Sequence, residues 1–137
     1  MKKIIIPIII LIISFLFGCN SSNPKLAKKM IEKYSDEQNY VTLIGEVVEF
    51  SDNSVVIMCE ELNDYISYED ELCDYYIYSE HNIKLLIGEQ IEFVTVPFHF
   101  YNGHQLPIVA LKTDEGILLS FEEGRENLIN WVSIHFK

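Results

Sequence analysis

The chain is poor in basic residues. It has 10 lysines and arginines against 21 aspartates and glutamates, so its formal net charge is −11. Residues 1–18 contain Lys2 and Lys3 and no acidic residue, and the charge without them is therefore −13. Such an acidic surface repels phosphate backbones, which argues against nucleic-acid binding. The partners we expect are neutral molecules, cations or other proteins.

Short motifs of common catalytic sites are also lacking. The sequence has no Gly-x-Ser-x-Gly element, no glycine-rich phosphate loop and no Asp-x-Asp-x-Asp-Gly calcium loop. We therefore predict that the protein is not an enzyme and needs no cofactor.

Long apolar runs are rare in this sequence, and the clearest one lies at the start of the chain. Residues 4–17 are almost wholly apolar and follow two lysines. The run ends in Leu16-Phe17-Gly18-Cys19, after which the chain turns polar. This segment resembles the lipobox of bacterial lipoproteins, and its length suits a signal peptide better than a membrane span. An uncleaved anchor helix is the alternative.

The lipobox resemblance implies a cellular location for the protein. It implies that residues 1–18 are a removable signal peptide, that Cys19 carries the lipid, and that residues 19–39 are a tether with a short helix. The protein would then be anchored in the cell membrane and face away from the cytoplasm. A second acyl chain would make this attachment stable.

Two further cysteines, Cys59 and Cys73, leave two alternatives open. An extracytoplasmic compartment permits a disulfide between them, which would contribute about 3 kcal/mol by restraining the unfolded chain. They are equally explained as two buried thiols. They do not form a close metal-binding clamp, and we predict no metal site for them.

The sequence predicts one helix and then a series of strands. Asn23-Pro24 suits a helix start, and apolar residues recur at helical spacing through Ser35 with lysines on the other face. Period-two patterns predict strands over residues 40–50, 54–59, 73–79, 90–101 and 104–113, and a short one over 116–121. Ser120 to Glu123 fits a capping box that starts a C-terminal helix.

Asn102-Gly103 predicts a tight two-residue hairpin, with Tyr101 opposite His104. That register defines two faces. The predicted core face carries Val94, Val96, Phe98, Phe100, Val109 and Leu111, and the opposite face carries His99, Tyr101, His104, Leu106 and Ile108.

Five strands in this order, with a first strand bent at Gly45 and a glycine just before the fourth, resemble an OB-fold over residues 40–113. We therefore expect a mainly β protein, with a small five-stranded OB-like barrel domain over residues 40–137 that includes the C-terminal helix. An open β-sandwich or a lipocalin-like fragment is the rival architecture. The whole chain resembles small uncharacterised lipoproteins of low-GC Gram-positive bacteria, and this resemblance transfers no functional residue. OB-folds bind oligonucleotides, sugars, peptides or proteins, so the fold does not settle the function.

Aromatic and histidine side chains are the candidate binding residues. They lie in the acidic loop 60–72, in the third strand and around the hairpin tip: Tyr65, Tyr68, Tyr76, Tyr78, His99, Tyr101 and His104. We predict that they serve a non-enzymatic interaction module at the cell surface, which binds an envelope protein or a glycan.

Two alternatives come from other functional classes. One is metal or cation handling by His99 and His104 with the acidic loop, although two histidines are too few for zinc. The other is an inhibitor or immunity-like protein whose acidic loop blocks a basic target.

The predicted lipid can be tested by mass. Intact protein from the membrane fraction should begin at Cys19 and carry a lipid increment, because the thiol is the acceptor. The increment should disappear in Cys19→Ala. A full-length, unmodified wild-type chain would instead identify the apolar run as an ordinary anchor helix.

Overall fold

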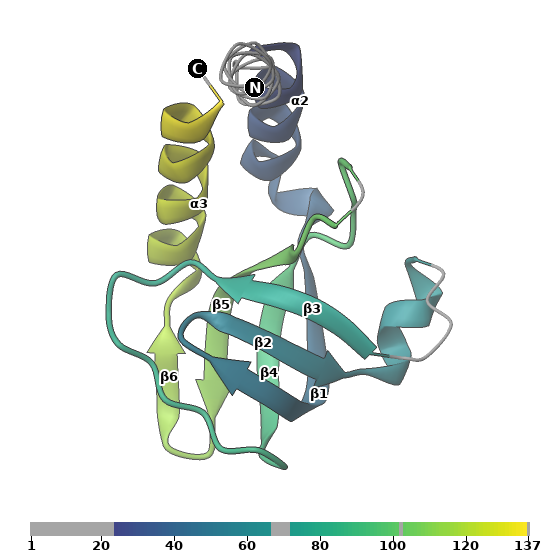
Figure 1. The fold of residues 1–137 in the computed structure, drawn as a ribbon, viewed down its shortest axis with the longest axis vertical. Helices are drawn as coiled ribbons and strands as arrows, with labels where there is room; N and C mark the ends of the chain where they lie inside the picture. Colours follow the sequence, from purple (N-terminus) through teal and green to yellow (C-terminus); the bar gives the residue numbers. More distant parts are fainter. Residues whose placement is uncertain (1–23, 67–71, 102, 137) are drawn as a thin grey trace, which may run out of the picture.

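The computed structural model describes residues 24–66, 72–101 and 103–136, and the fold is shown in Figure 1. Residues 1–23, with Cys19, and residues 67–71, with Tyr68, lie outside the described residues. The strands are β1 Val41–Ser51, β2 Ser54–Met58, β3 Leu72–Ile77, β4 Gln90–Thr95, β5 Leu106–Thr113 and β6 Gly116–Leu119. The helices are α2 Pro24–Ser35 and α3 Phe121–His135, with short 3-10 turns η1 Glu37–Asn39 and η2 Glu60–Asp64. The prediction of a mainly β protein with a closed five-strand barrel and two helices is confirmed.

The barrel closes through a parallel pairing of β3 with β5. Antiparallel pairs join β1 to β2 and β4, β2 to β3, and β4 to β5. Tyr75 then pairs with Leu106 and Ile77 with Ile108, which completes the ring. The side-chain amide of Gln105 spans this seam and donates to the Tyr75 carbonyl at 3.4 Å. This connectivity is consistent with an OB-like barrel.

The first strand pairs with two neighbours because it coils sharply. Its first half pairs with β4 and its second half with β2. A Cβ at Gly45 would collide with the Ile57 side chain and lie 2.8 Å from the Met58 carbonyl oxygen, so only glycine fits there. A bulge follows between Val47 and Glu49. The predicted bent first strand is therefore confirmed.

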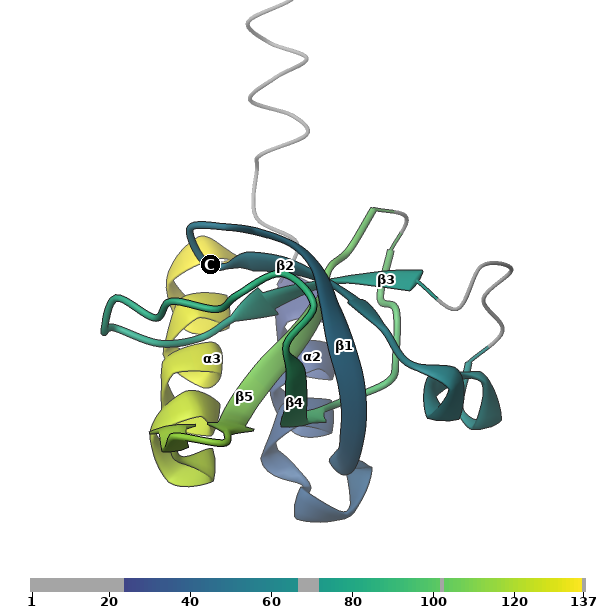
Figure 2. The ribbon, with the colours of Figure 1, turned by 90° about the horizontal axis from the view of Figure 1, so that it is seen from below.

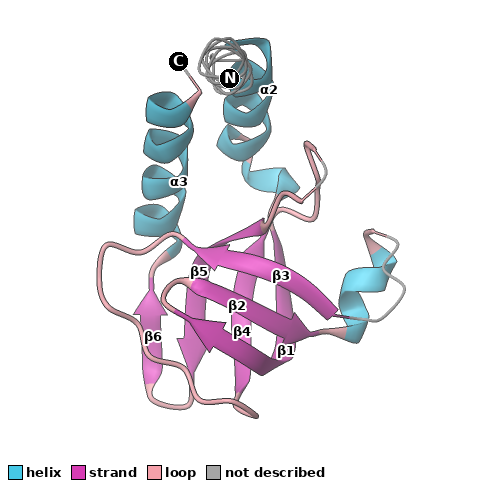
Figure 3. Ribbon diagram, in the orientation of Figure 1, coloured by secondary structure: helices cyan, strands magenta, loops and turns pink. Residues whose placement is uncertain are grey.

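Buried residues form two clusters on opposite sides of the barrel wall. The inner cluster includes Leu43, Ile57, Tyr75, Phe93 and Ile108. The outer cluster fills the space between the barrel and the two helices, with Met30, Tyr34, Val96, Val109, Leu128 and Val132. Figures 2 and 3 show the two helices together against the strands. The barrel wall is thus buried on both faces where the helices cover it.

Helix α3 begins with the predicted cap. The Ser120 hydroxyl accepts a hydrogen bond from the Glu123 amide at 3.4 Å, and acidic residues occupy the first turn, where the helix dipole favours them. One turn in, Gly124 lies directly on the β5 backbone. A Cβ there would overlap the carbonyl group of Val109. The helix therefore lies closer to the sheet than any other residue at position 124 permits.

The predicted two-residue hairpin is wrong. Strand β4 ends at Thr95 and β5 begins at Leu106, so residues 96–105 form a long loop. Phe93 pairs with Leu111, whereas a two-residue hairpin would pair it with Lys112. Two causes are visible: a bulge follows Val94, and prolines at 97 and 107 have no amide to donate to a ladder.

The predicted core face is correct in part: Val94, Val96, Phe100 and Val109 pack together in the outer cluster, whereas Leu111 and Phe98 do not join them. Val109 belongs to the outer cluster under the helices and Leu111 to the inner cluster, so they do not share a face. Leu106 and Ile108, which the predicted register placed on the binding face, are buried inside the barrel. Phe98, predicted in the core, is 40% exposed.

Replacing Gly124 tests the helix–sheet contact. Gly124→Ala should lower the free energy of unfolding by about 2 kcal/mol or more, because the helix must move away from Val109. Chemical denaturation measures this. Glu126→Ala, at an exposed position of the same helix, should change stability by less than about 0.5 kcal/mol. Equal effects of the two substitutions would refute the close approach.

Candidate binding site

The end of β3, the loop 96–105 and α3 together form what we call the aromatic groove, defined by Tyr76, Tyr78, Tyr101, His104 and Trp131. These residues, with Gly103 and Gln105, line a hollow of about 270 Å³. A neighbouring hollow of about 260 Å³ shares Tyr76, Tyr78 and Trp131 and continues along α3. Three segments far apart in the sequence thus supply one surface.

The rings of the groove pack mainly edge to face. Tyr76 and Tyr78 have ring centroids 5.0 Å apart at 65°, and Tyr78 and Trp131 are 5.9 Å apart at 70°. Tyr101 lies over His104 with centroids 5.0 Å apart. Edge-to-face contacts are favourable for aromatic pairs and hold each ring in one orientation. These contacts join Tyr76, Tyr78 and Trp131 on one side of the groove and Tyr101 and His104 on the other.

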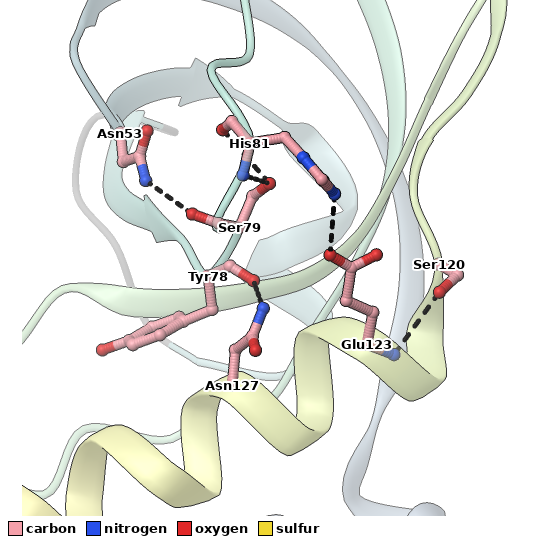
Figure 4. A network of polar contacts seen from close by, with 7 residues as sticks. All are labelled: Asn53, Tyr78, Ser79, His81, Ser120, Glu123 and Asn127. Atoms are coloured by element: carbon pink, nitrogen blue, oxygen red, sulfur yellow. Dashed lines mark hydrogen bonds and ion pairs between the residues drawn. The ribbon is translucent and has the colours of Figure 1, made fainter.

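Tyr78 is held in place from both sides. Its backbone amide donates to the Ile108 carbonyl at 3.1 Å, which extends the β3–β5 pairing one residue past β3. Its own carbonyl accepts from the Asn127 side chain of α3 at 3.1 Å, as Figure 4 shows. The ring is thus placed at the junction of sheet and helix.

A chain of polar contacts next to Tyr78 ties the same segment to α3 (Figure 4). Asn53 donates to the Ser79 carbonyl at 3.3 Å, and the Ser79 hydroxyl accepts from the His81 amide at 3.0 Å. The His81 ring meets the Glu123 carboxylate at 3.4 Å. This ion pair is exposed, so it contributes little energy. It joins the segment that follows Tyr78 to α3.

His104 is the most buried polar residue of the groove, at 9% exposure. Its Nε2 lies 3.4 Å from the Tyr34 hydroxyl of α2, and its carbonyl oxygen lies 3.0 Å from Nδ1 of His99. Burial, with a smaller contribution from His99, lowers the pKa of His104 to about 4. The ring is therefore neutral at neutral pH. Its Nδ1 has no hydrogen-bond partner among the described residues.

Tyr78 and Tyr101 of the groove are neutral as well. Burial raises the pKa of Tyr78, with smaller contributions from Tyr76 and Tyr101, and burial raises the pKa of Tyr101. The hollow beside His104 is therefore walled by uncharged rings, hydroxyls, an imidazole and the Gln105 amide. These groups suit a neutral polar ligand better than a phosphate, because none of them is a cation.

The structure brings together four of the predicted binding residues, namely Tyr76, Tyr78, Tyr101 and His104. His99 contacts His104 but lines a different groove, beside α2. Tyr65 is 52% exposed at the end of η2 and does not line the aromatic groove. Tyr68 is outside the described residues.

Trp131 and Gln105 line the groove and were not predicted as site residues. Trp131 was expected only to help a helix cover the sheet. As the only tryptophan of the chain, it was a signal that could have been weighed. Gln105 carries no such signal, because its placement depends on barrel closure.

The metal alternative gains no ligand set from this geometry. No group of three or more His, Cys, Asp or Glu side chains arranged to hold a metal ion occurs within residues 24–66, 72–101 and 103–136. A further histidine, His81, has its ring at the Glu123 carboxylate. Part of the acidic loop falls outside these ranges.

Cys59 and Cys73 are both buried, and the structure has them as separate thiols. The Cys59 thiol donates to the Ile44 carbonyl at 3.3 Å, and burial raises its pKa. The Cys73 sulfur lies 3.6 Å from the Asp74 carbonyl oxygen. Both side chains belong to the inner cluster of the core.

No protein-family model, no curated protein and no solved structure matches the chain. The function must therefore be inferred from the groove itself.

The buried His104 predicts a pH dependence of stability. Since the pKa of His104 falls from 6.5 to about 4 on folding, the unfolded chain binds more protons between these values. The contribution of His104 to the free energy of unfolding should be complete above pH 6.5. The free energy of unfolding should then fall by about 2 kcal/mol as the pH drops to about 4.

Denaturation curves measured across this pH range provide the check. His104→Gln should flatten the dependence, whereas His81→Gln, at an exposed position, should leave it in place. An unchanged profile in His104→Gln would show that His104 is not buried in its neutral form.

Proposed function

We propose that this protein is a lipid-anchored, non-enzymatic binding module on the outer side of a membrane, and that it binds a neutral glycan in the aromatic groove. The observation that carries the proposal is the hollow of about 270 Å³, walled by uncharged aromatic and hydrogen-bonding side chains from three elements.

Sugar rings match this chemistry. Their CH faces pack on aromatic rings, and their hydroxyls exchange hydrogen bonds with tyrosine hydroxyls, amides and neutral imidazoles. OB-like barrels are among the folds that bind oligosaccharides, which makes the ligand class compatible with the architecture.

Size and charge favour a glycan over the other ligand classes. Two adjoining hollows of about 270 and about 260 Å³ suit small ring-shaped units, whereas a protein partner usually covers about 800 Å² of each surface. The net charge of −11 argues against anionic polymers, including nucleic acids. A segment of another protein is the alternative ligand for such a binding module.

Membrane attachment is supported by the sequence of residues 1–19 and its likeness to a lipobox. Within the described residues, no helix is long and apolar enough to cross a membrane. A lipid on Cys19 would hold the groove at the envelope, where surface glycans are abundant.

Trp131 gives a direct test, since it is the only tryptophan and lines both hollows. Full-length protein in detergent is titrated with a panel of neutral oligosaccharides, and the tryptophan emission is followed. We expect a saturable change for at least one glycan. Tyr101→Ala should weaken that binding about tenfold or more, because a ring of the site is removed.

The matched control is Tyr65→Ala, which removes an exposed tyrosine that does not line the groove. It should leave the affinity unchanged. If peptides bind and no glycan does, the groove remains the binding site but its ligand is a peptide rather than a glycan. Equal weakening by both substitutions, or no response to either class, would contradict the proposal.

A further inference from the structure

The lysines of this acidic protein gather on one helix. Four of the 10 lysines and arginines lie on the 12 residues of α2, at Lys25, Lys28, Lys29 and Lys33. Only Glu32 opposes them on that helix. Elsewhere the surface is dominated by acidic residues, so α2 is a basic island.

The lysines lie on the outward face of α2. Its buried residues are Ala27, Met30 and Tyr34, which pack on the barrel and on α3. At 100° per residue, the lysines and Glu32 fall around the side opposite Tyr34. Lys25, Lys28 and Lys29 are exposed. The basic island is thus turned to solvent rather than to the rest of the molecule.

An exposed aromatic lies beside the lysine face. Phe98 of the loop 96–105 is 40% exposed, and the Lys33 ammonium lies 4.5 Å from the centre of its ring. Between this loop and α2 runs a groove of about 470 Å³ lined by Lys29, Lys33, Leu26, Phe98 and Phe100, with Glu32 among them. Lysines next to exposed aromatic rings are typical of surfaces that lie in a membrane interface.

Position in the chain brings this face to the bilayer. Pro24, the first residue of α2, follows Cys19 by five positions, and an extended chain of that length spans at most about 18 Å. If Cys19 carries the lipid, the start of α2 therefore stays near the headgroups. Attraction between lysines and an anionic surface acts within about 8 Å at physiological salt.

We propose that the lysine face of α2, together with Phe98, rests on the anionic lipid headgroups of the membrane to which the chain is anchored. The inference depends on the proposed anchoring and is independent of the glycan groove. The contact replaces a flexible tether with a second point of attachment, which fixes how the barrel is presented at the surface. The acidic barrel supports the same orientation, because anionic headgroups repel it.

Lysine labelling in vesicles tests the proposal. Full-length protein is reconstituted into neutral phosphatidylcholine vesicles and into vesicles that also contain about 30% anionic phosphatidylglycerol. An acylating reagent modifies exposed amines, and mass spectrometry follows each site. Lys25, Lys28 and Lys29 should react at least about threefold more slowly on the anionic vesicles, and high salt should abolish the difference. Lys84 and Lys112, exposed on the barrel, are internal controls that should react equally on both.

A charge variant keeps the test independent of folding. In Lys25→Gln/Lys28→Gln/Lys29→Gln, all at exposed positions, Lys33 should react equally on the two vesicle types, while Lys84→Gln/Lys112→Gln should retain the wild-type protection. Circular dichroism confirms that each variant is folded.

The remaining outcomes overturn the proposal in distinguishable ways. If the protein floats with both vesicle types and its lysines react equally, the docking fails and the anchoring stands. If it does not float with neutral vesicles, the anchoring fails, and the docking with it. If soluble polyglutamate protects the lysines as well as anionic vesicles do, the face binds acidic polymers in general, and the assignment to lipid is wrong.

Discussion

The close approach of α3 to β5 is the contact on which the outer half of the molecule depends. Gly124 lets the helix backbone lie directly on Val109, where a Cβ would overlap the carbonyl group. With the helix in this position, Leu128 and Val132 are buried in one cluster with Val109 and with Met30 and Tyr34 of α2. The polar side of the same helix then brings Asn127 to the Tyr78 carbonyl. One backbone contact thus sets the position of both helices and of one wall of the groove.

Barrel closure supplies the other walls. Because β3 runs parallel to β5, with Tyr75 opposite Leu106 and Ile77 opposite Ile108, the end of β3 lies beside the start of β5. This places Tyr78 near Tyr101 and His104, although more than 20 residues separate them in sequence. The loop itself exists because the bulge after Val94 and the prolines at 97 and 107 end the antiparallel ladder early. The same interruption leaves Phe98 and Tyr101 partly exposed instead of paired in a strand.

Local sequence signals predicted the elements well and the long-range geometry only in part. The capping hydroxyl of Ser120 and the phase change at Gly45 act within a few residues, and both are visible in the sequence. Asn102-Gly103 is an equally local signal, but it predicted the wrong register, since a bulge and two prolines several residues away outweigh the turn preference. Tyr76, Tyr78, Tyr101 and His104 were identified by residue type. That Trp131 joins them could not be read from the sequence, because it depends on where α3 crosses the sheet.

The groove can act as a binding site only if the Trp131 ring packs against the Tyr78 ring. That contact depends on the packing of Gly124 on Val109. Nuclear Overhauser effects in the folded protein test both contacts in one spectrum. We expect cross-peaks from the Gly124 α-protons to the Val109 backbone and from the Trp131 indole to the Tyr78 ring. Their absence in a protein with native strand pairing would mean that α3 is not seated on β5, and the aromatic groove would then not exist as a site.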